Sequence, residues 1–168
     1  MFSHAPAGYA CPFCLIVAGG ENPEPYADQA DVVLRTGKAT AFMSSSWWPN
    51  NPGHVLVVPD AHVENLYDLT PSVGADVLEA ARRIALAFKA VYRCAGVSTR
   101  QHNEPAGGQE VWHYHLHVFP RHEADQLYAR DAARRTVSRD ERAPYAERLR
   151  QFLSPPRGGA AERQPGSG

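Results

Sequence analysis

The stretch that decides the fold is Trp-His-Tyr-His-Leu-His-Val-Phe at residues 112–119. Its three histidines alternate with Tyr114, Leu116 and Val118. Because successive side chains of a β-strand point to opposite faces, we expect the histidines on one face and the apolar residues on the other. The apolar face can then pack on a core while the histidine face lines a site. We expect Pro120 to end this strand.

Three imidazoles on one face of a strand favour chemistry over a merely solvated surface. Imidazole is the side chain best suited to proton transfer and metal binding near neutral pH. A neutral imidazole can attack phosphorus or carbonyl carbon, with a neighbouring group fixing its tautomer. Three histidines can equally bind one catalytic zinc ion. The spacing alone leaves both interpretations open.

Length and composition predict a single domain. The chain has 168 residues, with 17 Lys and Arg against 18 Asp and Glu, and is long enough for a real core. No basic face large enough to indicate nucleic-acid binding is evident. No run of about 18 apolar residues predicts a membrane span, and no signal peptide is apparent. Three cysteines, an odd number, disfavour a secreted disulfide framework, so we expect a reducing cytoplasm.

The first part of the chain predicts a short helix and three strands. Pro12 can open a helix that Gly19 ends. Residues 31–35 and 39–43 are expected to form a hairpin around a short turn. Residues 54–59 contain Val-Leu-Val-Val, which is typical of a buried strand.

A long helix and a further strand are predicted next. Thr70 and Pro71 form a helix start, and apolar residues recur at helical spacing until Gly96 ends the helix. This helix should cover one face of the sheet. Residues 97–103 are expected to form a strand, and the charged pattern after Arg121 again predicts helix.

Other segments could carry chemistry. The C-x-x-C spacing of Cys11 and Cys14 fits two thiolates on a metal, a redox pair, or two buried thiols. Gly107 and Gly108 lie just before the histidines, where exposed backbone N–H groups can hold a phosphate. Trp47 and the tryptophan after it could form a wall of a base pocket or pack on the core.

The histidine stretch resembles the signature of the histidine-triad (HIT) superfamily. Further matching motifs occur in the expected order: the C-x-x-C pair, Gly-His-Val-Leu-Val-Val-Pro at residues 53–59, His62, Asn103 and Gly-Gly-Gln at residues 107–109. The resemblance implies an α+β fold, with an antiparallel sheet of about five strands and one long helix, usually as a homodimer. We expect a HIT domain over 9–122, a C-terminal helical extension over 123–153 and a disordered tail over 154–168.

The resemblance also implies hydrolysis or transfer at the α-phosphorus of a nucleotide, through a nucleotidyl-histidine intermediate. His115 would attack, His117 would lie beside the phosphate and leaving group, and His54 would belong to the same network. The expected substrate is a nucleoside phosphoramidate, a dinucleoside polyphosphate or a related conjugate. The expected substrate-binding residues are Asn103, Gly108, Gln109, Glu110, Ser44 and Trp47.

Bacterial zinc-carrying members use the C-x-x-C pair, a later histidine and the first triad histidine. The matching residues here are Cys11, Cys14, His62 and His113. Two thiolates and two imidazoles make a closed structural zinc site. Because such a site has no open coordination position, the resemblance disfavours the catalytic-zinc alternative.

Departures from the family pattern bear on the substrate. Glu110 stands where the hydrolase branches usually have Ser or Thr, and a carboxylate beside phosphate costs affinity unless it points away or acts as a base. Three serines at residues 44–46 occupy the region of the usual ribose-binding residue. The third triad position is His117, not the Gln of the nucleotidyltransferase branches, which favours hydrolysis. Glu110 also motivates the alternative of a nucleotide-binding regulatory protein with vestigial turnover.

Overall fold

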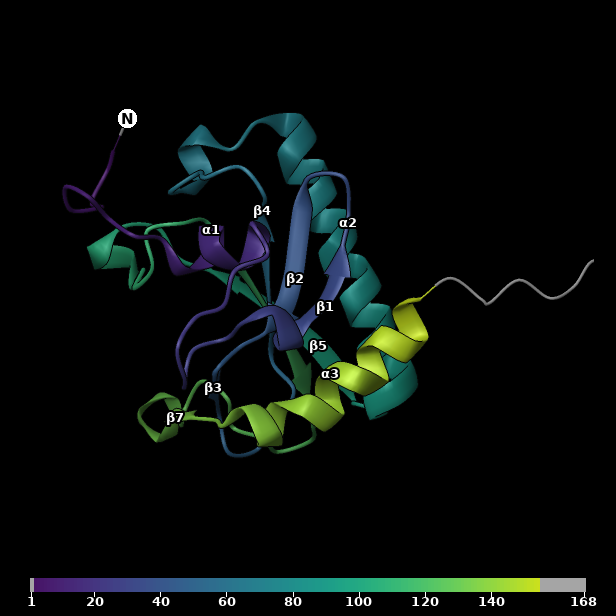
Figure 1. Cartoon of the computed structure of the whole chain (residues 1–168). Helices are drawn as coiled ribbons and strands as arrows, with labels where there is room; N and C mark the ends of the chain where they lie inside the picture. Colours follow the sequence, from purple (N-terminus) through teal and green to yellow (C-terminus); the bar gives the residue numbers. More distant parts are fainter. Residues whose placement is uncertain (1, 155–168) are drawn as a thin grey trace, which may run out of the picture.

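The computed structural model describes residues 2–154 and contains a five-stranded antiparallel sheet (Figure 1). The predicted α+β fold is therefore confirmed. Most of the tail predicted to be disordered, residues 155–168, lies outside the described residues. The spatial order of the sheet is β1 (Val32–Arg35), β2 (Ala39–Met43), β4 (Val55–Pro59), β6 (Leu116–Arg121) and β5 (Gly96–Gln101).

The long helix α2 (Pro71–Ala87) covers one face of the sheet (Figure 1). Alternation along β4 and β6 turns Val55, Val57 and Val118 toward this helix, where they share one core with its apolar residues. The helix continues as a π-helical segment, η3 (Phe88–Tyr92). It ends before the predicted Gly96, because the next residue is left-handed, with φ 53°.

The opposite face of the sheet carries a shorter helix and the site. Phe13 and Ile16 of α1 (Pro12–Val17) pack there on Phe42 and Leu56. The remaining area of this face is where the histidines gather. Short 3₁₀ turns complete the connections: η1 (Gln29–Asp31), η2 (Leu66–Asp68), η4 (Pro105–Gly107) and η5 (Asp131–Ala133).

The histidine strand is shorter than predicted, because β6 begins only at Leu116. The N–H groups of His113 and Tyr114 bond to loop carbonyls instead of to a neighbouring strand. Pro120 lies inside β6, so the prediction that it ends the strand is wrong. Beyond Val118 the strand pairs only with β5. Pro120 is tolerated there because its missing N–H removes no hydrogen bond to β4.

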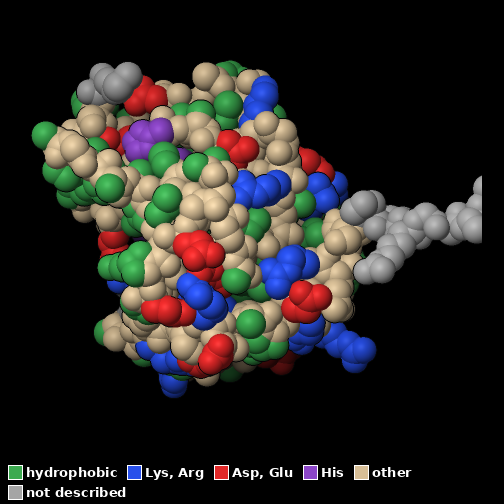
Figure 2. Space-filling model, in the orientation of Figure 1, with side chains coloured by type: hydrophobic (Ala, Val, Ile, Leu, Met, Phe, Trp, Pro, Cys, Tyr) green, Lys and Arg blue, Asp and Glu red, His purple; other side chains and the backbone are tan. Residues whose placement is uncertain are grey.

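The C-terminal extension crosses the sheet's first strand as α3 (Arg139–Leu153), preceded by β7 (Arg135–Thr136). β7 pairs with the short β3 (Ser46–Trp47). On the face shown in Figure 2, basic and acidic side chains are interspersed over the region of α3. Within residues 2–154, no helix combines the length and apolarity that a bilayer crossing requires.

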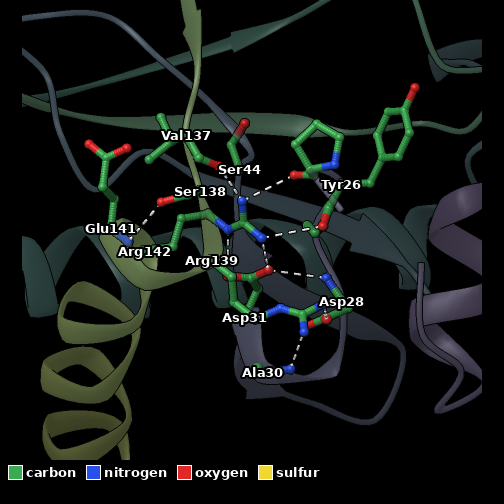
Figure 3. A network of polar contacts seen from close by, with 12 residues as sticks. Tyr26, Asp28, Ala30, Asp31, Ser44, Val137, Ser138, Arg139, Glu141 and Arg142 are labelled. Atoms are coloured by element: carbon green, nitrogen blue, oxygen red, sulfur yellow. Dashed lines mark hydrogen bonds and ion pairs between the residues drawn. The ribbon is translucent and has the colours of Figure 1, made fainter. Parts of the chain in front are cut away.

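A buried arginine fixes this extension to the rest of the molecule. Arg142, fully buried on α3, donates from two nitrogens to the carboxylate of Asp31, both at 2.8 Å (Figure 3). It also donates to the backbone carbonyls of Pro25 and Tyr26, at 3.1 and 3.2 Å. Removing one partner of a buried ion pair typically costs about 3–5 kcal/mol. The extension is thus held firmly against the segment that precedes β1.

Candidate active site

The sheet places three polar side chains on its face opposite α2. His54 immediately precedes β4, and His117 lies on β6 opposite Leu56. Arg100 of β5 pairs with His117 across the adjacent ladder. Because directly paired residues of antiparallel strands point to the same face, these side chains converge.

A hydrogen-bonded chain links the carbonyl of Ser46 to two of the histidines. Nδ1 of His54 lies 3.0 Å from this carbonyl oxygen, and Nε2 of His54 lies 3.0 Å from Nδ1 of His117. A carbonyl only accepts, so the neutral His54 ring carries its proton on Nδ1 and its Nε2 accepts from His117. Nε2 of neutral His117 therefore keeps an unshared electron pair.

Burial keeps both of these rings neutral. It lowers the pKa of His54 from the ordinary 6.5 to about 3, and the pKa of His117 also lies well below the ordinary value. The nearby charge of Arg100 acts in the same direction on both pKa values. Phe119 stacks on His54, with ring centroids 4.1 Å apart, and holds the ring in place.

His115 has the geometry of a nucleophile. Its Nδ1 donates to the backbone carbonyl of His113 at 2.7 Å, which leaves the electron pair on Nε2. The ring contacts Phe13 and His117, with centroid distances of 5.4 and 5.0 Å. Burial lowers the pKa of His115, so the ring is neutral near pH 7. A neutral imidazole fixed in this tautomer can attack an electrophilic centre.

Four side chains form a separate cluster of potential metal ligands: Cys11, Cys14, His62 and His113. Their ligand atoms all lie within 4.8 Å of one another. Nε2–H of His113 donates to the carbonyl of Pro59 at 2.9 Å, so its Nδ1 faces the two sulfurs, at 3.4 and 3.5 Å. Tetrahedral zinc with thiolate and imidazole ligands needs ligand atoms about 3.3–3.8 Å apart. The cluster is compatible with zinc.

This arrangement divides the histidine triad. Both ring nitrogens of His113 are directed away from His115, one to a carbonyl and one to the cysteines. Within residues 2–154, this Cys/His group is the only one of three or more candidate ligands that lies close enough to hold a metal. The geometry therefore disfavours a zinc ion shared by the three triad histidines.

An apolar cavity of about 190 Å³ opens beside His115 and His117. Its wall includes the serines at residues 44–46, so the predicted Ser44 does lie at the cavity. Its size and lining suit a flat aromatic ring with a few polar edges. The apolar walls come from α1, the sheet and adjoining loops: Phe13, Ile16, Phe42, Trp48, Leu56 and Val111.

A polar cavity of about 220 Å³ is also lined by His115 and His117. Arg100 and His102 line it, with the predicted Gly108 and Glu110. Gly108 has φ +85°, a left-handed conformation that favours glycine in this tight loop. Arg134, from the C-terminal extension, lines both cavities. His115 lines both cavities.

The structure corrects the placement of Trp47. Trp47 packs in the α2-side core, with its ring 5.0 Å from that of Tyr145, and lines neither cavity. Trp48, the next residue, points the other way and lines the apolar cavity. Sequence alone could not decide which of two adjacent indoles faces the core.

Two other predicted binding residues shape the loop rather than line either cavity. Gln109 donates to the carbonyls of Glu64 and Val111, at 2.7 and 3.0 Å, and accepts from the N–H of Glu104. The side-chain oxygen of Asn103 accepts from the N–H of Leu66 at 2.8 Å. A direct substrate contact from either residue stays a prediction.

Three basic residues of the polar cavity were not found from the sequence: Arg100, His102 and Arg134. Arg100 lies in the segment predicted as the strand at residues 97–103. Pairing of that strand with the histidine strand places Arg100 opposite His117. No sequence signal indicated Arg134, because it lies beyond the matched motifs in an irregular, charged segment. Its position depends on the pairing of β7 with β3.

Comparison with known proteins identifies the family of this chain. The sequence model of the HIT domain family matches residues 27–124, which is more than half of the chain. Protein hit of Bacillus subtilis is 34% identical over 112 residues, covering 67% of this chain and 71% of that protein. An asymmetrical bis(5'-nucleosyl)-tetraphosphatase of Schizosaccharomyces pombe is 34% identical over 96 residues, or 57% of this chain and 52% of that protein.

A solved structure supports the same assignment. The crystal structure of a Zn-bound histidine triad family protein from Mycobacterium smegmatis matches with a TM-score of 0.68 and 28% sequence identity. The match covers 86% of this chain and 93% of that chain. The sequence match and the shared fold show that this chain belongs to the HIT family, whose members include nucleotide hydrolases.

Proposed function

We propose that this protein hydrolyses a nucleotide conjugate at its α-phosphorus through a nucleotidyl intermediate on His115. The observation that carries the proposal is the hydrogen bond from Nδ1 of His115 to the carbonyl of His113, at 2.7 Å. It leaves the electron pair on Nε2 where an apolar and a basic cavity meet. A nucleophile between a site for a base and a site for phosphates suits a nucleotide.

The reaction would proceed in two displacements. Nε2 of His115 forms a bond to the α-phosphorus, and the bond from phosphorus to the leaving group breaks, with the electron pair going to the leaving group. A phosphate leaves as an anion, whereas an amine also takes up a proton from solvent. Water then attacks the same phosphorus, and the bond from phosphorus to Nε2 breaks and returns its electron pair to the ring. Nε2 of His117 can accept the proton that water loses. The products are a nucleoside monophosphate and the released group.

The two cavities support a separate position for each part of the substrate. The base would occupy the apolar cavity against Trp48, and the phosphates and leaving group would lie beside Arg100 and His102. Nucleoside phosphoramidates and dinucleoside polyphosphates both fit this division. The yeast relative is named for activity on a bis(5'-nucleosyl) tetraphosphate, which supports the same substrate class.

The Cys/His cluster would hold one structural zinc ion. The residues fit because two sulfurs and two imidazole nitrogens face one another, and Pro59 fixes the tautomer of His113. When bound, the ion would contribute to folding and would orient the loop that carries His115. A homodimer in the cytoplasm, which the family resemblance implies, stays a prediction.

A second candidate is a nucleotide-binding protein with vestigial turnover, which Glu110 motivates. Turnover separates the two. Purified protein is incubated with adenosine 5′-phosphoramidate and diadenosine tetraphosphate, and nucleoside monophosphate is quantified by chromatography. We expect multiple turnovers that His115→Ala abolishes. Tight binding of both compounds without product from either would support the regulatory protein and contradict the proposal.

A further inference from the structure

The C-terminal extension delivers one cation to the candidate active site. Arg134 donates from two nitrogens to the carboxylate of Glu110, at 2.8 and 3.1 Å. Both residues line the apolar and the polar cavity, beside His115 and His117. Glu110 comes from the loop before the triad, so this ion pair joins the C-terminal extension to that loop at the wall of both cavities.

The position of Arg134 is set by ordered structure on its C-terminal side. The next residue, Arg135, begins β7, which pairs with β3. Three residues beyond β7, Arg139 forms an ion pair with Asp28, and Arg142 makes its buried pair with Asp31 (Figure 3). These contacts place the guanidinium at the cavity before any ligand binds.

The chemistry of the polar cavity favours an anion. Arg100 and Arg134 both line it, and Glu110 is the one carboxylate among its described lining residues. The guanidinium of Arg134 also lowers the pKa of Glu110, so this carboxyl group stays ionised near pH 7. A guanidinium is always charged and its planar geometry matches phosphate oxygens, so Arg134 presents a cation suited to an anionic group at this cavity.

We infer that Arg134 is a specificity-determining residue that binds an anionic leaving group, such as a polyphosphate, and selects it over an uncharged amine. This inference rests on the proposed function and deepens it. In the Michaelis complex the charge of the Arg134 guanidinium attracts the leaving group's oxygens, while Glu110 holds the guanidinium in orientation. The departing phosphate takes the electron pair of the broken bond and leaves as an anion.

The tautomer of His117 supports this selection. Its Nδ1–H is used by His54, so Nε2 of the neutral ring has no proton to give to a departing group. An amine needs a proton as it leaves, whereas a phosphate departs as a stable anion. The pairing also explains why a carboxylate is tolerated at position 110, since its charge is matched by Arg134.

The test compares leaving groups on one nucleotide. kcat/KM is measured for diadenosine tetraphosphate and for adenosine 5′-phosphoramidate, and their ratio gives the preference for an anionic leaving group. We expect Arg134→Gln to lower this ratio about tenfold, as for loss of a charge-assisted hydrogen bond at a partly exposed site. Glu110→Gln breaks the same ion pair but removes a negative charge, so it should raise the ratio, by about threefold.

Arg135→Gln is the matched control. Arg135 is an exposed arginine in a bidentate pair with Glu141, and it lines neither cavity. Its substitution should leave the ratio unchanged. High salt should lower the ratio of the wild-type protein more than that of Arg134→Gln, because it screens the exposed charge.

Opposite shifts from Arg134→Gln and Glu110→Gln, with an unchanged control, support the inference. If both variants slow both substrates by the same factor, the pair is only structural and the inference is overturned while the hydrolase proposal stands. The same holds if Arg135→Gln shifts the ratio as Arg134→Gln does. If the wild-type protein turns over neither compound, the proposed function fails and the inference fails with it.

Discussion

Nε2 of His54 lies 3.0 Å from Nδ1 of His117, and the two rings are parallel to within 12°. Through this contact the backbone carbonyl of Ser46, which accepts from Nδ1 of His54, determines which nitrogen of His117 carries the proton. Because His54 must accept at Nε2, it has to stay neutral for His117 to present an electron pair. The protonation state of a buried ring thus supports both the fold and the chemistry.

Stability should therefore fall as the solution becomes acidic. The pKa of His54 is about 3 in the folded protein and about 6.5 in an unfolded chain. Between these values the unfolded state binds more protons, so the free energy of unfolding decreases as pH falls through this window. For one group the loss between pH 7 and 5 is about 2 kcal/mol. Urea unfolding at both pH values measures it.

The variant His54→Phe isolates this contribution. It retains an aromatic ring against Phe119 but carries no titratable nitrogen. Its loss of stability between pH 7 and 5 should be smaller than that of the wild type by about 2 kcal/mol. His122→Gln, at an exposed histidine, should keep the wild-type difference. An unaltered pH dependence in His54→Phe would show that His54 is not the buried neutral group described.

Zinc should copurify at about one ion per chain and support folding. Cys11→Ser should lose the metal and lower Tm, because serine is a poor zinc ligand. Cys94→Ser changes a buried cysteine outside the cluster and should retain the metal. Elemental analysis and thermal melts, with and without chelator, measure both effects. Unchanged zinc content in Cys11→Ser would mean that the ligands are misassigned.

The adjacent indoles should give different phenotypes. Trp48→Phe removes part of a wall of the apolar cavity. It should raise KM for a nucleotide substrate roughly three- to tenfold, which corresponds to the energy of one aromatic contact. Trp47→Phe removes part of the core ring that packs on Tyr145 and should lower Tm with KM nearly unchanged. Steady-state kinetics and melts on both variants decide the matter. Equal KM values for the two variants would contradict the assignment of the cavity wall.

Alternation along the histidine stretch predicted which side chains face the core, because burial of one face imposes a period of two residues. Tyr114 and Val118 do pack beneath α2. Where the strand begins was not predictable, since Tyr114 bonds to the carbonyl of Val63, far away in sequence. Local pattern carries no information about such distant backbone partners.

In the candidate site, too, the residues that belong to sequence motifs were predictable, and those placed by tertiary contacts were not. The metal cluster followed from the resemblance, and the structure brings its residues together. The position of Arg134 could not be predicted from the sequence. It depends on the polar two-residue strand at residues 135–136 and on the Arg142–Asp31 ion pair, and neither leaves a recognisable sequence pattern. The residue that faces Glu110 could be found only from the folded chain.

The most direct test of the central claim is the covalent intermediate on His115. Substrate labelled in the α-phosphate is mixed with enzyme, quenched in base within milliseconds, and the labelled peptide is sequenced by mass spectrometry. We predict one acid-labile, base-stable nucleotidyl group on His115, and at least about a 10³-fold loss of kcat in His115→Ala. An adduct on another residue, or near-wild-type turnover by His115→Ala, would contradict the account.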